Sequence, residues 1–109
     1  MFGNKMNQVE KAIAKSKTSS LIDLCGDKDA DVCLAAIAGL GSVGGDDASN
    51  FLISHLQDAD PKMRIAIAQA LGALGDMHTK AYESAQLSKE KNPDVQEALR
   101  KTLGQIKNY

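Results

Sequence analysis

Residues 58–76 read DADPKMRIAIAQALGALGD, and this stretch decides the fold. Its helix begins at Asp60-Pro61, an N-cap residue followed by a proline at the first helical position, where the missing N–H costs nothing. Apolar residues then recur at helical spacing as far as Gly75, a residue that can adopt the left-handed conformation found after many helices. The stretch therefore predicts one amphipathic helix with a defined start and end.

The chain repeats this pattern with a period near 31 residues. A shift of 31 aligns residues 21–44 with residues 52–75 without a gap and gives eight identities in 24 positions. A shift of 32 adds a third copy, whose helix begins at Asn92-Pro93. A period of this length fits one pair of helices per repeat, so the sequence predicts a stack of helical hairpins.

The first half of each repeat predicts a shorter helix before the long one. We place these first helices at residues 18–25, 47–57 and 77–89. The side chains expected on their apolar faces are Leu21, Ile22 and Leu24, then Phe51, Leu52 and Leu56, and finally Tyr82, Ala85 and Leu87. One further helix is predicted at residues 4–15, where it would cover the exposed side of the first repeat.

Composition narrows the function before any motif is considered. The chain has 109 residues, a net charge of −1 and only 4% aromatic residues. No apolar run approaches the ~20 residues that span a bilayer, and the first 15 residues lack a secretory signal. We therefore expect a cytoplasmic protein without a membrane contact. Basic residues neither cluster nor alternate with aromatic ones, so nucleic-acid binding is not expected.

Catalytic and metal-binding motifs are not evident in the sequence. Cys25 and Cys33 are expected to be free thiols in or near the core, because two cysteines form neither a disulfide framework nor a zinc site without matching histidines. The spacing of His55 and His78 suggests no dyad with a nucleophile. The glycine-rich segment 41–45 follows a helix and lacks the phosphate-binding pattern. We expect no enzyme, no cofactor and no metal.

Residues 58–76 resemble a HEAT repeat, most closely the short HEAT-like kind of phycobilisome (bilin) lyase-type proteins and small bacterial adaptors. The resemblance rests on Asp60-Pro61, Arg64, Ala66 and Leu71-Gly72, which fall at the positions of the family signature. Three copies cover residues 18–109, and the middle copy matches best. The resemblance implies an all-α fold: a short right-handed α-solenoid of about three helical hairpins plus the N-terminal helix.

This resemblance also divides the chain. We expect a single domain over residues 1–109, with an N-terminal capping helix at 1–15 and repeats at 16–45, 46–75 and 76–109. In the family an Asp and an Arg pair along the stack, and these positions match Asp58 and Arg64 here, which predicts a structural ion pair. The first copy has Cys33 and the third Gln96 in place of the Arg, so no continuous ladder can form and Arg64 would bridge to Asp27, Asp58 or Glu90.

The second helices carry apolar residues opposite their core faces. On a wheel of ~100° per residue, with Val32 at 0°, Leu34 lies at about 200°, and Ile65 occupies the same place one repeat on. In the resembling arrays these helices line the concave face, where an apolar strip often marks a binding surface. The residues predicted to contact a partner are Leu34, Ile37, Ile65, Gln69, Glu97 and Arg100.

Several interpretations of this strip remain open. In the first, the strip binds a helix or an extended peptide of a partner protein. In the second, the N-terminal helix or a second protomer of a homodimer covers it. In the third, its apolar residues are simply scattered on the surface. The leading hypothesis is a non-enzymatic protein–protein interaction module or scaffold. The alternative is a bilin lyase-type subunit or pigment-protein chaperone, which only the resemblance suggests.

Overall fold

The computed structural model describes residues 4–57 and 60–106, and within these ranges the chain is helical and contains no strand. This confirms the all-α solenoid predicted from the repeats. None of the described helices is long and apolar enough to cross a membrane. The helices run in the order α1 (Asn4–Ala14), α2 (Thr18–Leu24), α3 (Ala30–Val43), α4 (Asp46–Ser54), α5 (Pro61–Leu74), the 3₁₀ turn η1 (Met77–Thr79), α6 (Lys80–Lys89) and α7 (Pro93–Gln105).

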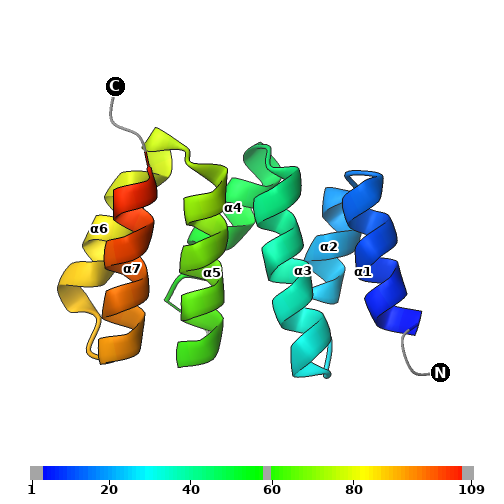
Figure 1. Ribbon diagram of the computed structural model, residues 1–109, viewed down its shortest axis with the longest axis horizontal. Helices are drawn as coiled ribbons and strands as arrows, with labels where there is room; N and C mark the ends of the chain where they lie inside the picture. Colours follow the sequence, from blue (N-terminus) through cyan, green and yellow to red (C-terminus); the bar gives the residue numbers. More distant parts are fainter. Residues whose placement is uncertain (1–3, 58–59, 107–109) are drawn as a thin grey trace.

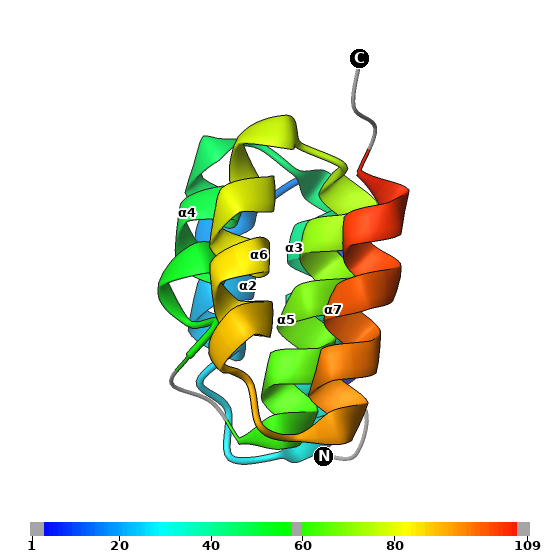
Figure 2. The same ribbon diagram turned by 90° about the vertical axis from the view of Figure 1, so that its left-hand side faces the viewer.

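The helices form two layers (Figures 1 and 2). Helices α1, α3, α5 and α7 lie side by side in what we call the inner row, and α2, α4 and α6 form the outer row. Along the inner row, α3 packs against α1 and α5, and α5 packs against α3 and α7. Helices α3 and α5 are therefore covered on two flanks by their neighbours and on their backs by the outer row.

The long helices begin and end where the sequence predicts. The side chains of Asp29, Asp60 and Asn92 are the N-caps of α3, α5 and α7, and each accepts a hydrogen bond from a backbone N–H in the first turn. Helices α3 and α5 end at Gly44 and Gly75, whose φ angles are 69° and 64°. The outer helices differ in detail, because α4 ends at Ser54 and the third begins with a 3₁₀ turn.

Glycines set the spacing of the inner row. A Cβ on Gly41 of α3 would lie 2.9 Å from the Cα and the carbonyl oxygen of Ala70 on α5. One repeat later, a Cβ on Gly72 would meet the Thr102 side chain at 3.2 Å, and the Thr102 hydroxyl donates a hydrogen bond of 2.9 Å to the Ala68 carbonyl. Adjacent inner helices thus approach until backbone meets backbone or a short side chain.

The first helix of the third repeat, α6, buries mostly polar residues, which corrects the face predicted for residues 77–89. Tyr82 and Ala85, expected to face the core, are exposed. The residues buried along this segment are instead Thr79, Glu83, Gln86 and Glu90. For this first helix of the third repeat the shift is 31, one residue less than the shift of 32 that aligns the second helix. It places Glu83 at the position of Leu21 and Leu52, and all three side chains are fully buried. A carboxyl group thus occupies a site that two earlier repeats fill with leucine.

This carboxyl group has few partners. One oxygen of Glu83 accepts a hydrogen bond of 3.3 Å from the Thr79 hydroxyl, while the other oxygen is buried without a partner among the described residues. Burial therefore raises the pKa of Glu83 to about 7, and the Thr79 hydrogen bond opposes part of that rise. Near neutral pH the third repeat holds a group that is partly protonated.

Helix α1 closes one end of the inner row. A hydrogen bond of 2.8 Å joins the Lys17 N–H to the Ala12 carbonyl, and Ser16 has a φ of 53°, which together reverse the chain into α2. The Lys5 ammonium lies 2.7 Å from the Asp27 carboxylate and ties α1 to the turn before α3. Because α1 lies beside α3 in the inner row (Figure 1), it does not cover the face where the apolar strip was predicted.

Candidate partner-binding groove

A groove of about 340 Å³ runs between α3 and α5 on the face of the inner row. Its floor and walls are mostly small or aliphatic, and α5 supplies most of them from one helical face. The lining residues are Leu34, Ala38, Lys62, Ile65, Ala66, Gln69, Ala70 and Ala73. The repeat explains their convergence, since Leu34 and Ile65 occupy the same position in successive long helices.

The groove is apolar with a polar edge. Leu34 and Ile65 are half-buried, so part of each side chain remains available for contact. Ala38 and Ala73 are exposed and leave space above the floor. Lys62 is the one charged residue in the lining. A groove of this kind suits the apolar face of a helix, with one acidic side chain near Lys62.

Three predicted contact residues, Leu34, Ile65 and Gln69, lie together in this groove. The prediction for Ile37 was wrong, because its side chain is only 1% exposed. The equivalent residue one repeat on, Ala68, is also buried and accepts the hydrogen bond from α7. This helix position therefore faces the neighbouring inner helix, which a wheel drawn for one isolated helix cannot show.

The two charged residues of the predicted set lie one helix further along. Glu97 and Arg100 are exposed on α7 and do not line the groove. The Glu97 carboxylate lies 3.7 Å from the Lys101 ammonium one turn away. An exposed pair of this kind contributes little to stability. The position held by Ile65 in α5 is thus held by a charged residue in α7.

The family arginine makes an ion pair between repeats. Arg64 donates hydrogen bonds of 2.8 and 3.0 Å to the two oxygens of Glu90, which is one of the three acceptors that the sequence suggested. The other residue of the predicted pair, Asp58, lies outside the described residues. The guanidinium, followed by the Gln86 and Asn92 donors, lowers the pKa of Glu90 to about 2 against the effect of its burial. This pair joins the start of α5 to the turn before α7.

The two cysteine thiols are not activated as nucleophiles. As predicted, Cys25 and Cys33 are free thiols, and the Cys33 thiol donates to the Cys25 carbonyl at 2.7 Å. Burial, followed by the nearby Cys33, raises the pKa of Cys25 to about 12, so its thiol stays protonated at neutral pH. His55 stacks on Phe51 at a ring separation of 4.2 Å. Across the described ranges, no group of His, Cys, Asp and Glu could hold a metal ion.

Sequence reasoning missed five of the eight lining residues of the groove: Ala38, Lys62, Ala66, Ala70 and Ala73. Their spacing contained the signal. Ala38 follows Leu34 by one turn, and Lys62 and Ala73 continue the helical face of Ile65 and Gln69 in both directions. Small side chains such as alanine open a groove between closely packed helices, but their apolar character alone does not mark them as binding residues.

Two rows of antiparallel helical hairpins define the class of α-solenoid repeat proteins. The family model for HEAT repeats matches residues 18–104. The chain belongs to the HEAT-repeat family, whose members generally mediate protein–protein interactions and typically form non-enzymatic scaffolds. In the comparison with curated proteins, no sequence matches the chain.

Proposed function

We propose that the protein is a binding module that holds an amphipathic helix of a partner protein in the α3/α5 groove. The observation that carries this proposal is the groove itself, where Leu34 and Ile65 from successive repeats form one apolar floor between exposed alanines. Half-buried aliphatic side chains on a rigid scaffold bind without a large ordering cost, since the two helices are already fixed by their close backbone approach.

The charge at the groove sets the direction of the partner. Lys62 lies in the first turn of α5, so it marks one end of the groove. An acidic residue of the bound helix would lie at this end, and Gln69 would pair with a polar group one to two turns further along. Glu97 and Arg100, exposed on the neighbouring α7, would contact only a partner that extends beyond α5.

Two pairs of exposed alanines allow a matched experiment. The variant Ala38→Glu/Ala73→Glu places carboxylates in the groove, and Ala81→Glu/Ala85→Glu places the same number on the outer helix α6. Each variant and the wild-type protein are used as baits to capture binding proteins from a cell lysate. A photo-crosslinking side chain in place of Gln69 reports which captured protein contacts the groove directly. We expect a protein that the wild type and the α6 variant retain, that crosslinks from Gln69, and that the groove variant loses.

Several outcomes would count against the groove. The proposal fails if both variants retain the same proteins, if the wild type retains none, or if a crosslinker on α6 captures the same protein as one at Gln69. Circular dichroism of both variants shows whether they remain folded. Bilin lyase-type activity remains a prediction from resemblance alone, and incubation with a bilin and a phycobiliprotein subunit tests it by visible absorbance.

A further inference from the structure

The outer row is one helix shorter than the inner row. Each of α3, α5 and α7 follows an outer helix of its own, namely α2, α4 and α6, whereas α1 has no preceding outer helix among the described residues. In Figure 1 the inner row continues past α3 to α1, while the outer row ends at α2. A notch lies between α1 and α2 at this end of the described stack.

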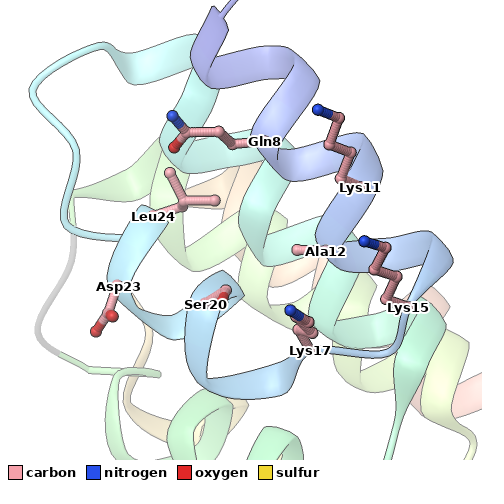
Figure 3. Close-up of a pocket in the computed structure, with 8 residues that line it drawn as sticks. All are labelled: Gln8, Lys11, Ala12, Lys15, Lys17, Ser20, Asp23 and Leu24. Carbon is pink, nitrogen blue, oxygen red and sulfur yellow. The ribbon is translucent and has the colours of Figure 1, made fainter.

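The notch is an open recess between two helices. Its volume is about 360 Å³, and Figure 3 shows the residues that line it. On α1 the lining residues Gln8, Lys11 and Ala12 have the i, i+3, i+4 spacing of one helical face, and Lys15 follows directly after the helix end. On the other side the lining residues are Lys17, Ser20, Asp23 and Leu24. Ala12 is 4% exposed and Leu24 half-buried, which gives the notch a small apolar floor.

The notch is basic and its charge is not neutralised. Three lysines, Lys11, Lys15 and Lys17, line the notch with a single carboxylate, Asp23, and in Figure 3 Asp23 lies on the opposite side of the view from Lys11 and Lys15. None of the three forms an ion pair with any residue that the structure describes, whereas Lys5 nearby is paired with Asp27. The tight turn at Ser16 brings Lys17 back beside the end of α1. Uncompensated charge around an apolar floor favours an acidic ligand with an apolar centre.

We propose that this notch is a second docking site, which receives an acidic amphipathic helix from a partner protein. The bound helix would lie along the notch between α1 and α2, with a small apolar side chain against Ala12 and Leu24 and carboxylates near the three lysines. A recess between two helices fits an inserted helix better than a flat layer of anionic lipid headgroups. This proposal is independent of the α3/α5 groove, because no residue lines both sites.

The test uses the full chain and a defined probe. The probe is a hydrocarbon-stapled helical peptide with an apolar stripe flanked by glutamates, and its control carries lysines instead of the glutamates. We expect the acidic peptide to shift the amide resonances of residues 8–24 in ¹⁵N spectra, and we expect its affinity to fall as NaCl is added. The lysine peptide should bind at least about tenfold more weakly.

Two charge-matched variants locate the effect. Lys11→Glu/Lys15→Glu/Lys17→Glu should weaken the acidic peptide by about tenfold or more, and the milder Lys11→Gln/Lys15→Gln/Lys17→Gln should weaken it in the same direction. The control Lys28→Glu/Lys89→Glu/Lys91→Glu changes three exposed lysines elsewhere and alters the net charge equally. It should leave the affinity within about twofold.

Four results would overturn the proposal. They are an acidic peptide that binds no better than the lysine peptide, equal losses in the two lysine-to-glutamate variants, resonance shifts that map to residues 34–38 and 62–73 instead, and a notch that binds vesicles containing phosphatidylserine but not the peptide. The last result would assign the lysines to a membrane surface. A failed groove experiment leaves all four readouts unchanged, so the two proposals fail separately.

Discussion

Replacing Glu83 tests how the polar third repeat affects stability. The folded state raises the pKa of this carboxyl from its usual 4.5 to about 7, with burial as the main cause. Above pH 4.5 the unfolded chain releases a proton that the folded chain retains, so the free energy of unfolding falls as the pH rises and levels off above the folded pKa. At about 1.4 kcal/mol per pKa unit the full loss is about 3 kcal/mol, of which about 2.5 falls between pH 5 and pH 8.

The assay is urea unfolding followed by far-ultraviolet circular dichroism at pH 5 and pH 8. We expect wild-type protein to lose about 2 to 3 kcal/mol between these values. Glu83→Leu restores the side chain found at the equivalent positions 21 and 52, and it should be at least about 2 kcal/mol more stable than wild type at pH 8. Thr79 keeps a partner in this variant, because its hydroxyl also donates to the Asp76 carbonyl at 2.8 Å.

Glu83→Gln separates the charge from the packing. It has the same shape and cannot ionise, so its stability should lack most of the wild-type fall between pH 5 and pH 8. All other side chains remain unchanged in this variant, so any difference between the two profiles belongs to Glu83. A Glu83→Gln profile parallel to that of wild type would refute the reasoning, and so would a Glu83→Leu variant that is less stable at pH 8.

Three further perturbations test the packing and the ion pair by denaturant unfolding. Gly41→Ala should destabilise the protein by about 1 to 3 kcal/mol because the new Cβ meets the Ala70 backbone. The control Gly104→Ala should be neutral or stabilising, because a Cβ there has nothing within 4 Å. Equal effects of the two substitutions would contradict the close contact at Gly41. Arg64→Leu should lower the free energy of unfolding by about 2 to 4 kcal/mol at pH 7. This loss should become smaller as the pH falls from 4.5 through the Glu90 pKa of about 2, because the carboxylate becomes protonated. A loss that does not change with pH would contradict the ion pair. Ser16→Gly should stabilise by about 1 kcal/mol because its φ of 53° suits glycine, and a loss would contradict this.

The sequence was sufficient for the fold wherever local signals agreed with the repeat. Asp60-Pro61 and Asn92-Pro93 determine helix starts through side-chain caps, and Gly44 and Gly75 determine helix ends through positive φ angles. These signals act within a few residues, so a single chain displays them fully. The repeat then determines the stacking, because each hairpin must bury its apolar face against the next.

The site was only partly predictable because it depends on neighbouring helices. A wheel places Ile37 close to Leu34, yet Ile37 is 1% exposed because an inner helix is covered on both flanks. The buried polar side of α6 was missed because an apolar face was sought, although the shift of 31 aligns Glu83 with two leucines. The notch beside α1 depends on how α1 and α2 pack against each other, which no local pattern encodes.

The width of the α3/α5 groove and the chemistry of its opening depend on different residues. Gly41 lets α3 approach the backbone of Ala70 on α5 closely, so the exposed side chains at the opening contribute little to the helix separation. Ala38 and Ala73 can then change to larger or charged residues while the helix separation stays constant. Selectivity for one partner over another can therefore be altered one side chain at a time, and the scaffold suits the engineering of new binding preferences without redesign of its core.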